Sequence, residues 1–179
     1  MYCDDFVVCC ESENDAKAFL NQLQERFKKF GLSIAEDKTQ IIKFGKREWY
    51  LAEKQNRKVS TFNFLGFTHY GKKSRKGKWI MCHKTSKSNM ARKLKEIKEY
   101  LKEVRNRVLL KEWGPTLILN VKGHLNYFGI SGNYYCLEQF KNSVLHLAFK
   151  WINRRSQKKS MSWERYLRFL DIIHCQNQG

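Results

Sequence analysis

The residues best suited to chemistry lie in the stretch Tyr2-Cys3-Asp4-Asp5, which runs into the apolar residues Phe-Val-Val at 6–8. Two adjacent carboxylates beside β-branched residues are typical of a tight turn at a strand edge, where Asp4 and Asp5 project together. Mg²⁺ takes oxygen ligands and usually recruits one or two carboxylates plus substrate phosphates. Two such ions clamp the attacking and leaving oxygens of a phosphoryl displacement. The pair predicts this chemistry, with at least one more carboxylate needed, or else a solvated acidic turn.

The elements that position this pair begin with a predicted strand over Phe6–Cys10. An amphipathic helix follows, with Ser12 as its N-cap, Asp15 three residues on, and Gly31 as a left-handed residue at its end. The apolar positions that recur at helical spacing are Ala16, Phe19, Leu20, Leu23, Phe27 and Phe30. Short extended segments at 32–34 and 39–44 are expected around a polar turn at 35–38, which gives a strand, helix, strand order.

The next part of the sequence predicts a hairpin. Residues 45–60 are charged and lack clear periodicity, so we expect an exposed loop there. Aromatic residues then crowd around Gly66, and a second strand is expected at 78–83 after a basic turn at 71–77. A glycine inside a strand often marks the close approach of another backbone or a ligand. The alternative is a simple aromatic core hairpin.

From Ser86 onward the apolar spacing becomes helical and predicts a three-helix bundle. The first helix carries a narrow apolar seam of Met90, Leu94, Ile97, Leu101, Val104 and Val108. Gly114-Pro115 is expected to open the second helix, because proline suits a first turn. The break at 129–133 ends it, and the third helix carries Leu137 to Trp151.

The charge balance indicates a polyanionic partner. The 179 residues include 35 Lys and Arg against 17 Asp and Glu, a net charge of +18. Nucleic acid is favoured over a membrane surface, because the sequence has no apolar run long enough to span a bilayer and no signal-peptide pattern. The predicted outward face of the first bundle helix carries Arg92, Lys95, Lys98, Lys102 and Arg105, and Arg154 and Arg155 follow the third helix. A solvated charged face is the alternative.

The six cysteines do not indicate a metal site. They form no Cys-x-x-Cys pair, and no histidine stands at a spacing suited to zinc. Most are expected to be small buried hydrophobes in a reducing, cytoplasmic compartment.

Several motifs occur in the order seen in one family. Tyr2-Cys3-Asp4-Asp5 resembles the active-site hairpin of reverse transcriptases, with Gly31-Leu32, Lys38-Thr39 and Phe64-Leu65-Gly66-Phe67 behind it. More specifically, the chain resembles the C-terminal part of a group II intron reverse transcriptase/maturase. The later landmarks of this resemblance are Leu119-Asn120, Asn126-Tyr127-Phe128, the run from Trp151 to Arg155, and the run from Ser162 to Tyr166.

This resemblance implies an α+β fold: a partial palm with a small antiparallel sheet and a helix at 1–84, a helical thumb or maturase domain X at 85–170, and a tail at 171–179. It implies an RNA-directed DNA polymerase with two Mg²⁺ ions, an RNA template or intron RNA, a DNA primer and dNTPs.

The resemblance also implies roles for individual residues. Asp4 would be a metal ligand, with Asp5 its auxiliary carboxylate. Tyr2 would lie beside the primer end, and Lys38 near the nucleotide phosphates, where it would protonate pyrophosphate. The segment Phe64-Leu65-Gly66-Phe67 would be the primer grip. Lys38 is otherwise one surface lysine among many.

The family's fingers and first palm motif, which carries another metal-binding aspartate, have no counterpart in these 179 residues. We therefore expect little activity from the chain alone, and a separately encoded N-terminal half is one way to complete it. Two alternatives remain: a non-catalytic maturase-type module that binds intron RNA and assists splicing, and an inactive remnant of a mobile element.

Overall fold

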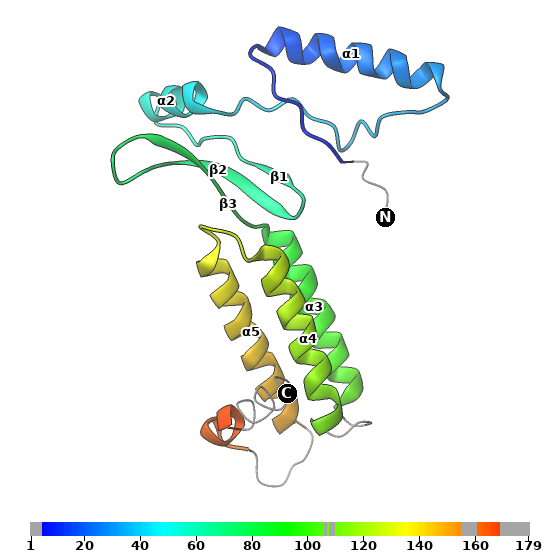
Figure 1. Cartoon of the computed structure of the whole chain (residues 1–179), viewed down its shortest axis with the longest axis vertical. Coiled ribbons are helices and arrows are strands. Elements are labelled where there is room, and N and C mark those ends of the chain that lie inside the picture. Colours follow the sequence, from blue (N-terminus) through cyan, green and yellow to red (C-terminus); the bar gives the residue numbers. More distant parts are fainter. Residues whose placement is uncertain (1–4, 106, 108–109, 155–160, 169–179) are drawn as a thin grey trace. The chain divides into compact units, whose positions relative to one another are not determined.

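The computed structural model of the chain describes residues 5–105, 107, 110–154 and 161–168. It divides into two compact units, Met1–His83 and Lys84–Gly179 (Figure 1). The α+β fold class predicted from the sequence is confirmed, because a small antiparallel sheet precedes a helical region. In the described ranges, none of the helices combines the length and the apolar composition needed to cross a bilayer.

The first unit opens with helix α1, Glu13–Lys29. The Ser12 hydroxyl accepts a hydrogen bond from the Asp15 N–H at 3.1 Å, as the predicted N-cap requires. At the other end Gly31 has a φ of +69°, and its N–H and that of Leu32 donate to the carbonyls of Lys28 and Phe27. This is a Schellman motif, so both predicted ends of the helix are confirmed.

The strands predicted around α1 do not form. Residues 6–10, 32–34 and 39–44 have no regular secondary structure, although the turn at 36–38 is present. A strand needs a neighbour to satisfy its backbone groups, and the described residues offer these segments none. One long-range contact does bring a segment to α1: the carboxylate of Glu13 pairs with Lys17 at 2.7 Å and Lys43 at 2.8 Å. These two lysines lower the pKa of Glu13 to about 2.

The loop predicted at 45–60 was wrong, because residues Lys46–Lys54 form helix α2. Although its sequence is mostly charged, Trp49 and Ala52 lie three residues apart, are both buried and form a short apolar face. Charged side chains tie the helix to its surroundings. Glu48 pairs with Arg57 at 2.6 Å, and Lys73 of the sheet pairs with Glu53 at 3.2 Å and lies 5.9 Å from the centre of the Trp49 ring. Tertiary packing, rather than periodicity, forms α2.

The sheet has the order β1-β2-β3, formed by Phe62–Phe64, Phe67–Lys73 and Trp79–Thr85. The basic turn contains fewer residues than predicted. The Ser74 N–H donates to the Lys78 carbonyl, and Ser74 accepts hydrogen bonds from the N–H groups of Gly77 and Lys78. Gly71 therefore lies within β2. It meets two indoles, because a Cβ placed there would come 2.5 Å from Trp79 Nε1 and 2.9 Å from Trp49 Cδ1.

The second unit contains helices α3, Lys87–Val104, α4, Leu110–Phe128, and α5, Tyr134–Asn153. Ser86 caps α3 by accepting from the Asn89 N–H. The prediction that Gly114-Pro115 opens α4 was wrong, because the helix begins at Leu110 and includes Pro115. Proline removes one backbone hydrogen bond there, while burial of Trp113 and Leu117 in the bundle core favours the longer helix.

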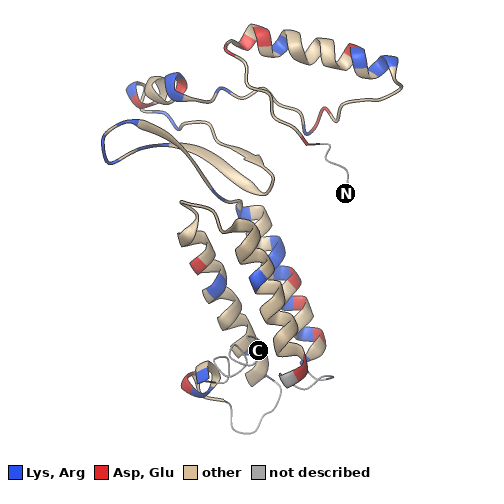
Figure 2. Cartoon of the chain, viewed as in Figure 1, with Lys and Arg blue, Asp and Glu red and all other residues tan. Residues whose placement is uncertain are grey.

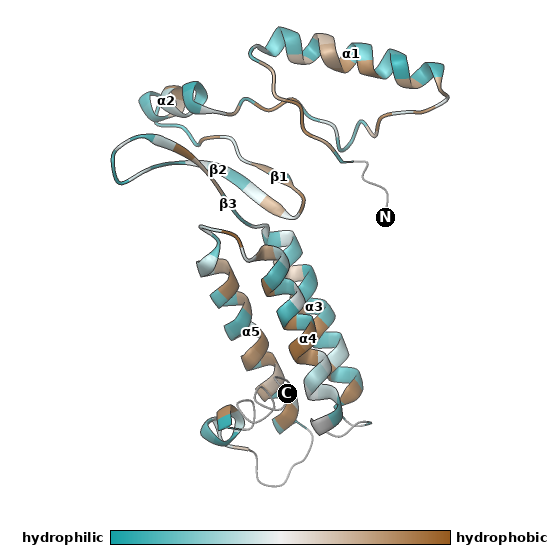
Figure 3. Ribbon diagram, in the orientation of Figure 1, coloured by the Kyte–Doolittle hydropathy of each residue, from teal (hydrophilic) through white to brown (hydrophobic). Residues whose placement is uncertain are grey.

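The bundle has its own apolar core. The buried residues in contact are Ile97, Leu101, Trp113, Leu117, Phe140, Val144, Ala148, Trp151 and Tyr166. Apolar residues are frequent along α4 and α5, whereas α1 is mainly hydrophilic (Figure 3). Tyr166 belongs to a short helical segment at 163–168. Asn153 makes two hydrogen bonds to the backbone of Met161, which lies just before this segment.

Candidate active site and nucleic-acid surface

The carboxylate pair is only partly within the described residues. Tyr2 and Asp4 lie outside them, while Asp5 is exposed at the start of the extended segment 5–10. Phe6 beside it is 57% exposed, so this segment is not packed among described residues. Asp5 therefore offers its carboxylate to solvent.

Lys38 lies in the predicted turn, and its position is fixed by the backbone. The Ala35 carbonyl accepts hydrogen bonds from the Lys38 and Thr39 N–H groups at 3.1 and 3.0 Å, and from the Thr39 hydroxyl at 2.9 Å. The Lys38 side chain is exposed and makes no ion pair with a described residue. No hydrogen bond or ion pair between described residues joins it to Asp5.

Mg²⁺ has a suitable donor type here but not a complete site. Carboxylate oxygens are its preferred protein ligands. Within the described ranges, however, no three His, Cys, Asp or Glu side chains gather in a way that could hold a metal ion. The described part contributes the single carboxylate of Asp5 from the predicted pair.

The predicted primer-grip residues form the connection between β1 and β2. Phe64 pairs with Phe67 across the two strands, and Leu65 and Gly66 make a two-residue turn with φ values of +47° and +82°. Both signs are positive, as in a type I′ hairpin turn, so Gly66 is a turn residue and not a strand residue as predicted. A left-handed conformation costs a leucine roughly 1–2 kcal/mol. Leu65 is 51% exposed at the tip of the hairpin.

Aromatic side chains pack against one another beside this hairpin. Phe62 stacks on His69 with ring centres 4.8 Å apart, and Phe44 contacts Phe62 edge-on at 5.0 Å. Burial, together with the nearby His83, lowers the pKa of His69, while a hydrogen bond to the Phe64 backbone opposes the shift. His69 is therefore neutral at pH 7 and packs as an aromatic ring.

Basic and acidic residues both lie along α3 (Figure 2). The basic residues predicted there differ in the contacts that they make. Lys95 and Lys98 are exposed and make no hydrogen bond or ion pair in the part of the chain that the structure describes. Lys102 lies 3.6 Å from Glu99, and Arg92 pairs with Glu96 at 3.2 Å.

Arg105 departs from its predicted outward position. Its Nε atom is buried and has no hydrogen-bond partner among the described residues, and its guanidinium lies 4.8 Å from the centre of the Trp151 ring. Arg154, which follows α5, lies 5.3 Å from the centre of the same ring. Cation–π contact therefore holds both side chains at the end of the bundle. Arg155 lies outside the described residues.

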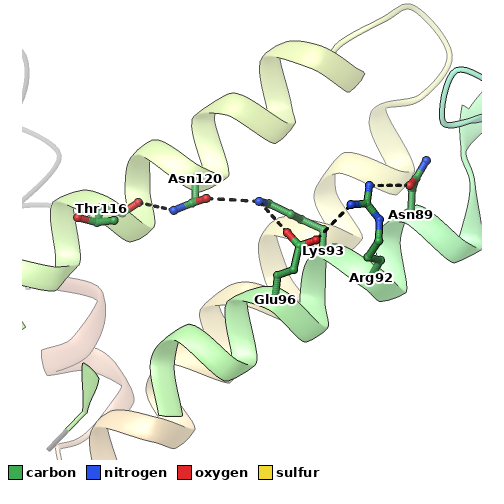
Figure 4. A network of polar contacts seen from close by, with 6 residues as sticks. All are labelled: Asn89, Arg92, Lys93, Glu96, Thr116 and Asn120. Carbon is green, nitrogen blue, oxygen red and sulfur yellow. Dashed lines mark hydrogen bonds and ion pairs between the residues drawn. The ribbon is translucent and has the colours of Figure 1, made fainter. Parts of the chain in front are cut away.

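A polar network connects α3 to α4 (Figure 4). Lys93 donates to Glu96 at 3.2 Å and to Asn120 at 3.3 Å, and Asn120 donates to the Thr116 carbonyl. Arg92 donates to the same carboxylate and to Asn89. Sequence reasoning missed Glu96, although its i,i+4 and i,i+3 spacing from Arg92 and Lys93 is a usable signal.

Sequence reasoning also missed Asn133, which is 1% exposed. Its side chain accepts from the Thr85 N–H at 2.9 Å and donates to the Thr85 hydroxyl at 2.8 Å and the Phe128 carbonyl at 2.9 Å. The α4–α5 turn is thereby fixed to Thr85, which precedes the Ser86 N-cap of α3. Its position at a helix start suggests an N-cap, but the side chain makes no capping bond.

Comparison with known proteins gave a family match in the first part of the chain. Residues 1–69 match the family model for reverse transcriptase (RNA-dependent DNA polymerase). The match covers the Tyr-x-Asp-Asp stretch, α1, the Lys38 turn, and β1 with the turn into β2, and supports a reverse transcriptase domain there. Searches of curated proteins and of solved structures gave no match.

Proposed function

We propose that this chain is the C-terminal part of a group II intron reverse transcriptase: part of the RNA-directed DNA polymerase palm followed by a helical thumb, the domain X of maturases. One observation carries the proposal. A stretch matching reverse transcriptase at 1–69 is followed by a basic three-helix bundle with a core of its own. The bundle carries the landmarks that resemble domain X.

Within this proposal Asp4 and Asp5 are ligands of Mg²⁺, which would supply charge stabilisation for nucleotidyl transfer. Lys38 lies near the nucleotide phosphates and donates a proton to pyrophosphate. Tyr2 lies beside the primer end. The exposed Leu65 tip and the flanking Phe64 and Phe67 hold the primer strand.

The uncovered face of α1 supports a further polypeptide that completes the catalytic domain, on the same chain or separately encoded. No residue of α1 is buried, although the helix is amphipathic. Phe19 is 40% exposed, and Phe30 just beyond the helix is 70% exposed. A hollow of about 490 Å³ along this face is lined only by residues of α1 and by Phe30. Exposed apolar faces of this kind mark interaction sites.

The bundle is expected to bind RNA through Lys95 and Lys98. Each phosphate contact releases a counterion, so log affinity falls with log salt at a slope of about −0.7 per contact for single strands and −0.9 for duplex DNA. Lys95→Ala combined with Lys98→Ala should weaken binding to a structured RNA and reduce the magnitude of the slope by roughly one to two.

The matched control is Lys46→Ala combined with Lys54→Ala on α2, which removes the same charge from exposed lysines outside the bundle. Fluorescence anisotropy across a salt series measures both. If the bundle variant retains the affinity and slope of the wild type, α3 is a solvated charged face and the RNA-binding part of the proposal is wrong.

The independent core of the bundle also favours a second candidate function, a maturase-type module that binds intron RNA and assists splicing without chemistry. Both functions need RNA binding. Only the polymerase needs Asp4 and Lys38, so substitutions there distinguish the two.

A further inference from the structure

The exposed surface of α3 is divided into two stripes of opposite charge. Successive residues of an α-helix are about 100° apart around its axis. On this spacing Lys87, Lys95, Lys98 and Lys102 fall within about 80°, and we call them the basic stripe. Glu96, Glu99 and Glu103 fall within the next 60° or so and form the acidic stripe.

Contacts with the other helices orient the two stripes. Lys93 and Tyr100 follow the acidic stripe around the helix, and both reach α4: Lys93 to Asn120 and the Tyr100 hydroxyl to the Trp113 carbonyl at 3.3 Å. On the same spacing Arg105 falls at the angle of Lys87, the edge of the basic stripe that lies away from the acidic stripe, and it contacts Trp151 of α5. The acidic stripe therefore borders α4, and the basic stripe borders α5.

Glu96 neutralises two cations at the border with α4. One of its carboxylate oxygens lies 3.2 Å from Arg92 and the other 3.2 Å from Lys93. Asn89 and Asn120 accept further hydrogen bonds from these two cations. Figure 4 shows both side chains converging on this carboxylate from α3, with Asn120 completing the link to α4. Both cations therefore have protein acceptors already.

The basic stripe has no comparable carboxylates. Lys87, Lys95 and Lys98 have no ion pair with a described residue. Lys102 has one at 3.6 Å, longer than either contact of Glu96. The stripe runs for about 22 Å along the helix, since each residue rises 1.5 Å.

An incoming phosphate competes with Glu96 for Arg92 on unequal terms. Exposed ion pairs contribute little, so the pair alone does not hold Arg92 in place. Transfer of Arg92 to a phosphate, however, leaves the Glu96 carboxylate within a few ångströms of a second negative charge, which is unfavourable. Lys87, Lys95 and Lys98 have no ion pair with a described residue and bind a phosphate without that penalty, whereas Lys102 has Glu99 at 3.6 Å.

We infer that RNA follows the basic stripe on the α5 side of α3, and that Glu96 sets the edge of this surface by keeping Arg92 and Lys93 from the phosphates. The inference rests on the proposed RNA-binding function. It adds which face of α3 contacts the RNA and which residue limits that face. Glu96 acts here as a specificity-determining residue through Arg92 and Lys93.

The test is the salt dependence of binding to a structured RNA by the full chain, in a double-mutant cycle. Glu96→Gln should free Arg92 and Lys93, so the magnitude of the salt slope rises by about one to two. Each added contact is worth roughly threefold in affinity between 50 and 200 mM salt. Arg92→Ala should leave the slope of the wild type unchanged, and should lower it by about one in the Glu96→Gln background.

The matched control is Glu138→Gln, which removes one negative charge from an exposed glutamate of α5 that has no ion pair in the described ranges. Thermal unfolding verifies that each variant is folded. Equal slopes for Glu96→Gln and Glu138→Gln, or a lower slope for Arg92→Ala in the wild-type background, would overturn the inference. If the wild type does not bind RNA at all, the proposed function itself fails. Loss of binding in the Lys95/Lys98 variant with no effect of Glu96→Gln leaves the proposed function standing and removes only this inference.

Discussion

At the scale of single residues, Asn133 is the polar side chain on which the bundle depends most. It is buried and makes three hydrogen bonds, two with Thr85 and one with the Phe128 carbonyl. Asn133→Ala removes all three and leaves the buried Thr85 N–H without an acceptor, which costs about 1–3 kcal/mol for each such group. The midpoint of denaturant unfolding measures the loss. Asn142→Ala, at an exposed position of α5, is the control, and equal stability of the two variants would contradict this role.

His124 makes bundle stability depend on pH. It is 7% exposed and stacks on Phe140 with ring centres 3.8 Å apart. Burial, and secondarily the charge of Lys93, lowers the pKa of His124 from 6.5 to about 4. Below about pH 6.5 the unfolded chain therefore binds a proton that the folded chain does not bind until about pH 4. Stability should be complete above pH 6.5 and fall between pH 6.5 and 4, by at most about 3 kcal/mol.

The measurement is urea unfolding of the wild type and His124→Gln at pH 7.5, 5.5 and 4.5. The glutamine variant removes the titrating group, so its disadvantage relative to the wild type should shrink as the pH falls. A constant difference between the two proteins across this range would show that His124 does not titrate as described.

Residue patterns predicted both ends of α1, because caps are local. Ser12 and Gly31 act within four residues of sequence and occupy the positions expected of them. Asn133 was not predicted, because its partners lie on other elements and become neighbours only after folding. Glu96 was overlooked, although its partners Arg92 and Lys93 lie on the same helix. The roles of Asp4, Asp5 and Lys38 remain predictions from resemblance.

At the scale of elements, the packing of α2 on the sheet depends on Gly71. A methyl group there meets the rigid rings of Trp79 and Trp49, so Gly71→Ala should destabilise the first unit by about 1–3 kcal/mol. Gly123 is the matched control, because it lies within α4 with open space around its Cβ position. Gly123→Ala should stabilise the bundle by about 0.5–1 kcal/mol. Thermal unfolding measures both, and a neutral Gly71→Ala would mean that the two indoles move apart easily.

Sequence periodicity predicted the elements that carry their own apolar stripe, namely α1, α3 and α5. It failed where formation of an element depends on a distant partner. Helix α2 has only Trp49 and Ala52 as its buried face, and these pack on residues some twenty positions away. Conversely, residues 6–10 have strand-like side chains but no paired strand within the described ranges. β-propensity describes fit to a sheet, so it does not build a strand without one.

At the scale of the whole molecule, the net charge of +18 indicates a polyanionic partner. The division into two compact units is consistent with a separate module that binds this partner. Sequence alone predicted the excess of positive charge but not which side chains are unpaired. Arg92 and Lys93 form ion pairs with Glu96, whereas Lys95 and Lys98 form none with a described residue. The match to reverse transcriptase covers residues 1–69, which lie in the first unit. We propose catalysis for this unit and nucleic-acid binding for the other.

Primer extension on an RNA template tests this central claim most directly. The 179-residue chain alone should not incorporate dNTPs, because its carboxylate pair does not supply the full ligand set of a two-metal site. A polypeptide providing the fingers and the first palm motif should restore Mg²⁺-dependent extension. In that reconstituted enzyme Asp4→Ala should abolish extension, whereas Lys38→Ala should slow it by roughly 10²- to 10⁴-fold. Extension that survives Asp4→Ala, or robust Mg²⁺-dependent extension by the chain alone, would contradict the account.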